Sequence, residues 1–163
     1  MTREDQILKK DRMLYTKDTL SANLVLAAIV LDALYFVSIY NSDVGTYYYN
    51  WVIGASIIYN LLFMLGAFLA SEGVKNRKNG YSVMLILLGL MQIGRVFYLP
   101  TMAHEAVVTV KKEELVVMGD EQFYFVVACL VISGICCCAA AVTSYINNKT
   151  LADYVRSNEK QSA

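Results

Sequence analysis

The chain has 163 residues, of which 57% are hydrophobic and 17% are charged, and its formal net charge is zero. Soluble domains are less apolar, at about 45–50%, and more charged, at about 25%. The composition therefore argues against an ordinary soluble domain, and the zero net charge gives no indication of a nucleic-acid partner.

The first segment, residues 1–19, carries mixed charges and a few apolar side chains. The positions of Ile7, Leu8 and Leu14 predict a short amphipathic cytoplasmic helix, for which Thr2 and Asp5 form an imperfect capping box. Such a helix is expected to lie on the membrane surface or against a partner. A plain helical extension of the following apolar segment is an equal alternative.

Charges are nearly excluded from four long segments in residues 20–146, which predict an all-α, polytopic membrane protein built as a four-transmembrane-helix bundle. About 20 apolar residues are needed for a helix to cross the hydrocarbon core, and only a helix satisfies its own backbone there. The first of these apolar segments, Leu20–Tyr40, is too long for a cleaved signal peptide and contains Asp32. The four predicted spans are Leu20–Tyr40, Trp51–Ala70, Tyr81–Leu99 and Phe123–Ile146.

Lysine and arginine are distributed asymmetrically around these spans. Of the fourteen, eleven lie in residues 1–19, in the loop 71–80 and after Ile146, whereas only Lys111 and Lys112 lie in the other two loops. The positive-inside rule therefore predicts a cell-membrane protein with both termini in the cytoplasm. Tyrosines and Trp51 around the loop 41–50 are expected to form an aromatic belt at the outer interface, and a ligand-binding lip is less favoured.

The loop 100–122 is the largest predicted segment outside the membrane. Its runs Ala106–Val110 and Leu115–Met118 flank a charged turn and predict a small extracytoplasmic hairpin. An isolated hairpin is marginal in water, so it would need the loop 41–50, the membrane or another chain beside it. The polar tail, residues 147–163, is expected to leave the helix after one or two cytoplasmic turns.

Polar residues inside the predicted spans are the main functional candidates. Asp32 lies roughly 18 Å along its helix from Leu20, too deep for a short side chain to reach water. Arg95 lies at a similar depth in a span that runs in the same direction, with Gln92 one turn away. We predict that Asp32 and Arg95 face the interior and interact, although Arg95 could equally extend to the outer headgroups.

The predicted intramembrane polar cluster is completed by Asn60, which shares one side of its helix with Ser56. Ser133 lies at similar depth in the fourth span. Groups of this kind most often hold helices together, and a midplane substrate site is the rarer use. For Asp32 a structural ion pair is slightly favoured over a role in transport.

Catalytic, metal and cofactor sites are not expected. The four cysteines all lie in the fourth span and are expected to serve as small apolar side chains. His104 beside Glu105 is far short of a zinc motif, and the sequence contains no nucleophile elbow or phosphate-binding loop. The cysteines are Cys129, Cys136, Cys137 and Cys138.

The sequence favours a non-enzymatic accessory or scaffold subunit of a larger, transporter-type membrane complex. Its expected partners are the lipid bilayer and either another protein subunit or further copies of itself. The alternative is a small oligomeric ion- or proton-coupled transporter or channel that uses Asp32. A sensor that uses the aromatic outer loops is a third possibility.

Overall fold

The computed structural model describes residues 8, 11–12, 16–47, 51–110 and 113–162. Four helices in this part of the chain are long and apolar enough to cross a membrane, which confirms the predicted multi-pass helical architecture. They are α2 (Thr19–Tyr40), α4 (Trp51–Lys75), α5 (Asn79–Gly94) with its continuation, and α7 (Asp120–Ser162). The continuation of α5 consists of the short 3₁₀ helix η1 (Arg95–Phe97) and α6 (Leu99–Glu105).

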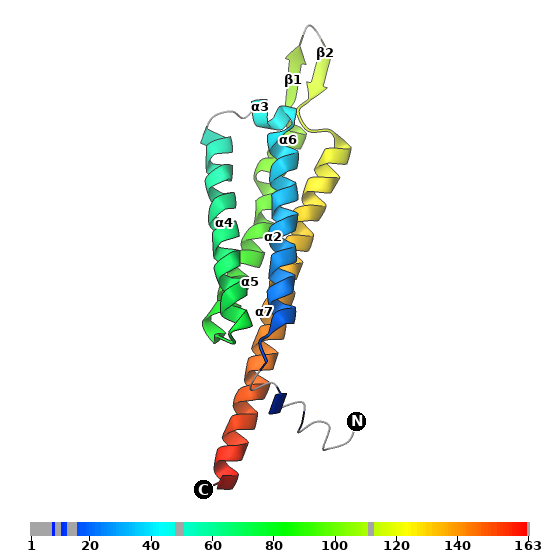
Figure 1. Cartoon of the computed structure of the whole chain (residues 1–163). Coiled ribbons are helices and arrows are strands. Elements are labelled where there is room, and N and C mark those ends of the chain that lie inside the picture. Colours follow the sequence, from blue (N-terminus) through cyan, green and yellow to red (C-terminus); the bar gives the residue numbers. More distant parts are fainter. Residues whose placement is uncertain (1–7, 9–10, 13–15, 48–50, 111–112, 163) are drawn as a thin grey trace.

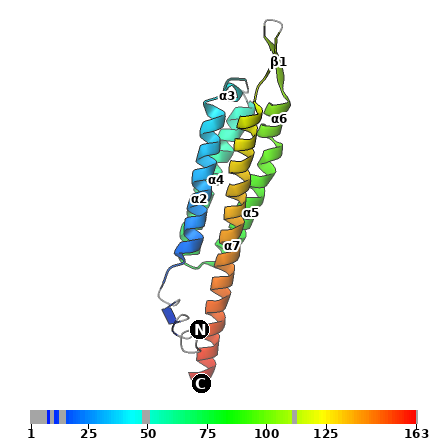
Figure 2. The same cartoon turned by 90° about the vertical axis from the view of Figure 1, so that its right-hand side faces the viewer.

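The four helices form a ring in which neighbours run in opposite directions. Both α2 and α5 pack against α4 and against α7, so α2 and α5 occupy opposite corners. In Figure 2, α2 and α5 lie on the two sides of the bundle with α4 and α7 between them. Any direct link between α2 and α5 must therefore cross the centre of the bundle.

The interior is divided along its length into three layers. One apolar cluster at the α3 end includes Tyr35, Leu99 and Leu130. A second apolar cluster, toward the α4–α5 turn, includes Phe63 and Leu85. On all four helices the polar residues of the candidate site lie in sequence between residues of these two clusters.

Glycines bring α5 and α7 close together below the polar layer. A Cβ built on Gly89 would lie 2.9 Å from the carbonyl oxygen of Gly134, and one built on Gly134 would lie 2.9 Å from that of Gly89. Because the opposing atoms belong to the backbone, they cannot move aside independently of the helix. These two glycines allow close helix packing, the common use of small residues in membrane bundles.

Asp18 caps α2 and connects the helices at the end of the bundle that the charge distribution predicts to be cytoplasmic. Its Oδ1 accepts from the backbone N–H of Ser21 at 3.2 Å, satisfying one of the first-turn donors. Its other carboxylate oxygen accepts from Asn147 of α7 at 3.1 Å, and its backbone N–H donates to Lys75 of α4. One residue thus connects three helices.

The opposite end carries α3 (Asp43–Tyr47) and a two-stranded hairpin (Figure 1). Strands β1 (Val107–Val110) and β2 (Glu113–Val116) pair antiparallel, with Val107 opposite Val116. The second strand begins two residues earlier than the sequence pattern predicted. At the base of the hairpin, the rings of His104 and Phe123 stack with centroids 4.3 Å apart.

Several predicted boundaries differ from those in the structure. Helix α4 continues five residues beyond Ala70, and the third span is interrupted after Gly94. The tail was expected to leave the helix soon after Ile146, but α7 continues to Ser162 and projects well past the bundle (Figure 1). The amphipathic helix predicted within residues 1–19 lies mostly outside the described residues.

Candidate functional site

The candidate site is the polar layer between the two apolar clusters, which we define by six side chains. All six are buried and they come from all four long helices. In a hydrocarbon environment, each such group is costly unless it is paired. The residues of the polar layer are Asp32 on α2, Ser56 and Asn60 on α4, Gln92 on α5, Arg95 at the end of α5 and Ser133 on α7.

Asp32 and Arg95 form an ion pair across the bundle. Arg95 Nη1 lies 3.1 Å from Asp32 Oδ1, and the two side chains are 6% and 0% exposed. Because α2 and α5 are at opposite corners of the ring, this pair joins two helices that pack mainly against α4 and α7. Such burial makes removal of one partner strongly destabilising, since the other charge is left uncompensated.

The guanidinium of Arg95 has further partners on α4 and α2. Its Nη2 donates to Ser56 Oγ at 3.1 Å and to the Ser56 carbonyl oxygen at 3.4 Å. The rings of Tyr35 and Tyr59 flank it, with centroids 4.3 and 4.7 Å from Cζ. Cation–π contacts of this kind gain strength when water is excluded. Arg95 therefore points inward rather than to the outer headgroups.

Gln92 extends the network to α7. Its Nε2 donates to Asp32 Oδ1 at 2.8 Å and makes a longer contact of 3.4 Å with Ser133 Oγ. Ser133 Oγ donates in turn to the carbonyl oxygen of Ala28 at 3.0 Å. One continuous set of hydrogen bonds thus connects all four long helices at a single depth.

The helix break beside Arg95 follows from Pro100. Proline has no N–H, so it cannot donate to the carbonyl of Val96 four residues earlier, and its ring crowds that carbonyl. The hydroxyl of Thr101 donates to this carbonyl instead, at 2.9 Å. Tyr98 adopts φ −96° and ψ −98° between η1 and α6. Arg95, the first residue of η1, therefore lies at the point where the regular α-helix ends.

Several polar atoms of the layer have no hydrogen-bond partner among the described residues. They include Asp32 Oδ2, Gln92 Oε1 and both side-chain polar atoms of Asn60. Asn60 lies one turn from Ser56, and Gln92 lies one turn from Arg95 in the same direction, so their depths match. This unpaired set has the polarity of a site for water, a proton or a small cation.

A cavity of about 310 Å³ opens beside Arg95, between α4 and α5. Arg95 and Ser56 provide its polar atoms, and the side chains of Tyr59, Met91 and Tyr98 provide much of its apolar lining. Its volume is at the lower end of the range for small-molecule sites. The cavity therefore borders the polar layer at the side of the bundle, between α4 and α5.

Of the four residues predicted to form the cluster, the structure brings three into direct contact, namely Asp32, Gln92 and Arg95. Asn60 is buried at a matching depth but makes no hydrogen bond to them. Sequence reasoning missed Tyr35 and Tyr59. Each lies three residues after a polar-layer residue on the same helix, well inside the predicted aromatic belts, and that spacing was the available signal.

Comparison of this chain with protein-family models, with curated proteins and with solved structures finds no match.

Proposed function

We propose that this protein is a non-catalytic, multi-pass membrane protein with both termini in the cytoplasm, and that it serves as an accessory or scaffold subunit of a larger membrane complex. The observation that carries the proposal is the hydrogen-bonded network through the four helices. Asp32 neutralises Arg95, while Ser56 and two tyrosine rings contact the guanidinium group, which also borders the cavity between α4 and α5. An arginine held by contacts from two other helices suits a fixed brace better than a site that exchanges partners.

The length of α7 supports the same function. Its 43 residues correspond to about 65 Å, roughly twice the thickness of the hydrocarbon core. We call residues 147–162 the cytoplasmic arm. A polar helix of this length is marginal alone in water, so a partner that packs along it is the expected source of its stability. Within the chain, the arm is contacted by the N-terminal segment, where Tyr154 donates a hydrogen bond to Asp11.

The test is purification from native membranes in a mild detergent, followed by mass determination of the intact complex. We expect a stoichiometric partner, such as an ATPase or a large permease. Thr150→Pro interrupts the arm by removing a helical hydrogen bond and crowding the carbonyl of Ile146, and should release the partner. Thr150→Ala is the matched control and should retain it. Recovery of the wild-type chain alone, as a defined homo-oligomer, would contradict the proposal.

A second function, a small oligomeric ion- or proton-coupled transporter or channel, is favoured by one observation. Asp32 Oδ2, Gln92 Oε1 and the amide of Asn60 are buried and unpaired among the described residues. Acceptors of this kind could hold a proton or a cation at the middle of the membrane. In proteoliposomes, this function requires a flux that Asp32→Asn abolishes while the protein stays folded and assembled. Loss of assembly without any flux in the wild type supports the subunit function instead.

A further inference from the structure

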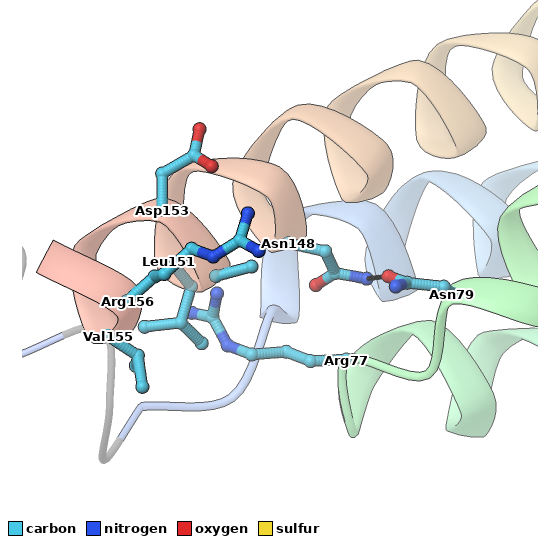
Figure 3. Close-up of a pocket in the computed structure, with 8 residues that line it drawn as sticks. Arg77, Asn79, Asn148, Leu151, Asp153, Val155 and Arg156 are labelled. Carbon is cyan, nitrogen blue, oxygen red and sulfur yellow. Dashed lines mark hydrogen bonds between the residues drawn. The ribbon is translucent and has the colours of Figure 1, made fainter. Parts of the chain in front are cut away.

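A second cavity, of about 550 Å³, lies at the end of the bundle where the α4–α5 turn meets the cytoplasmic arm. Figure 3 shows its side chains coming from α7 on one side and from the turn and the start of α5 on the other. It is far from the polar layer in sequence and shares no residue with it. Its lining includes Arg77, Asn79, Asn148, Leu151, Val155 and Arg156.

Arg77 adopts a backbone conformation that favours glycine, with φ at +57°. It follows the last turn of α4, where its N–H donates to the Val74 carbonyl and the next N–H donates to that of Gly73. This is the hydrogen-bond pattern of a Schellman motif, whose left-handed position is most often glycine. Backbone strain of this kind is unfavourable and concentrates at functional positions. An arginine is therefore held where the turn itself prefers no side chain.

The guanidinium of Arg77 is oriented but incompletely paired. Its Nε donates to the Thr16 carbonyl at 3.2 Å, whereas Nη1 is buried and has no hydrogen-bond partner among the described residues. Arg156 extends from the arm toward the same space. Asp153 also lines the cavity, but its carboxylate is directed away from the guanidinium group of Arg77 (Figure 3). Within the described part of the chain, neither arginine forms an ion pair. Two converging positive charges in one cavity favour an anionic ligand.

The rest of the lining suits a ligand that is both polar and apolar. Asn148 is 7% exposed and donates to Asn79 Oδ1 at 2.8 Å, while its own Oδ1 is buried without a partner among the described residues. Leu151 and Val155 add an apolar wall from the arm. Asn79 is the first residue of α5, two residues before the predicted third span, so the cavity lies beside the level at which headgroup phosphates are expected.

We propose that this cavity binds a phosphate anion, held between the guanidinium groups of Arg77 and Arg156. The anion is either the headgroup of an anionic phospholipid of the leaflet at the α4–α5 turn or a free phosphate compound. Arginine suits both because its planar fork of donors matches phosphate oxygens. Basic cavities at the cytoplasmic ends of membrane helices bind anionic headgroups in this way. Asn148 Oδ1 is placed to accept from a hydroxyl next to the phosphate.

The test measures ligand binding to the full-length protein in detergent after its lipids have been removed. Phosphatidylglycerol and phosphatidylcholine with identical acyl chains are titrated in turn, and bound lipids are counted by native mass spectrometry. The wild type is expected to bind phosphatidylglycerol about tenfold or more tightly than phosphatidylcholine, as charge-assisted bonds predict. Inorganic phosphate is titrated separately, alone and as a competitor. Retention of the lipid against phosphate identifies a headgroup site, and displacement at similar concentration identifies a free-phosphate site.

Three variants separate binding from folding. Arg77→Gly removes the guanidinium and relieves the left-handed strain, so it should lose about tenfold in affinity while the unfolding temperature of the lipid-free protein is unchanged or higher. Arg156→Gln should lose affinity similarly. Lys149→Gln removes an exposed charge from the same arm outside the lining and should bind as the wild type does. The proposal is overturned if the wild type prefers neither phosphatidylglycerol nor phosphate, or if Lys149→Gln weakens binding as much as Arg156→Gln.

Discussion

The guanidinium of Arg95 lies 3.1 Å from the carboxylate of Asp32, 63 residues earlier in the chain. The pair joins α2 to α5 across the centre of a ring in which each packs mainly against α4 and α7. Close packing between neighbouring helices fixes the sides of the ring, but only side chains that reach across the centre fix its diagonal. The polar layer therefore sets the relative positions of helices that apolar contacts leave apart.

Gln92 is expected to contribute measurably to this arrangement. Gln92→Leu removes its bonds to Asp32 and Ser133 while keeping the side chain's approximate volume. Hydrogen bonds between membrane helices are worth about 0.6–2 kcal/mol each, so we expect a loss of unfolding free energy of that order. Leu87→Met, at an exposed position on the same helix, is the control and should be neutral. Equal unfolding curves for Gln92→Leu and the wild type would show that these bonds add no stability.

The contact between α5 and α7 predicts opposite outcomes for two glycines. Gly89→Ala places a methyl group 2.9 Å from a backbone oxygen of α7, and overpacking of this kind typically costs about 1–3 kcal/mol. Gly54→Ala is the control, because a Cβ there meets nothing within 4 Å and alanine is the better helix former. Thermal unfolding in detergent should therefore fall for the first variant and stay level or rise for the second. The same response from both would contradict the close approach of α5 and α7.

The orientation derived from the charge distribution is tested with reporter fusions. A fluorescent protein that matures only in the cytoplasm should fluoresce when attached after Ala163. Alkaline phosphatase, which is active only outside, should be active when fused to a chain truncated after Ser42. These results follow because eleven of fourteen lysines and arginines lie on the side of the termini. The opposite pair of activities would reverse the topology and place the arm outside the cell.

Much of the architecture could be predicted because the relevant signals are local. The four spans follow from length and the exclusion of charge, and the proximity in depth of Asp32 and Arg95 follows from counting 1.5 Å per residue along helices that run the same way. The break after Gly94 was missed. The third span was predicted as one continuous helix, Tyr81–Leu99, although the proline at position 100 affects the turn that precedes it.

The remaining errors concern long-range contacts. The continuation of α7 to Ser162 was not predicted. The sequence after Ile146 carries no strong signal that ends a helix, but its polar composition was wrongly read as such a signal. The contacts of Tyr35 and Tyr59 with Arg95 depend on how three helices rotate relative to one another, which periodicity alone does not determine. The cavity between Arg77 and Arg156 brings together residues of the α4–α5 turn and the arm, and no local pattern connects them.

The most direct test of the central claim, that the polar layer braces the bundle, is a double-mutant cycle on Asp32 and Arg95. Unfolding free energies are measured in mixed detergent for Asp32→Asn, Arg95→Met, the double variant and the wild type. The exposed pair Glu72 and Lys75 is the control cycle, for which a coupling below about 0.5 kcal/mol is expected. We predict that each single change at the buried pair costs about 3–5 kcal/mol and that the double variant costs much less than their sum. Additive losses, or single variants as stable as the wild type, would contradict the account.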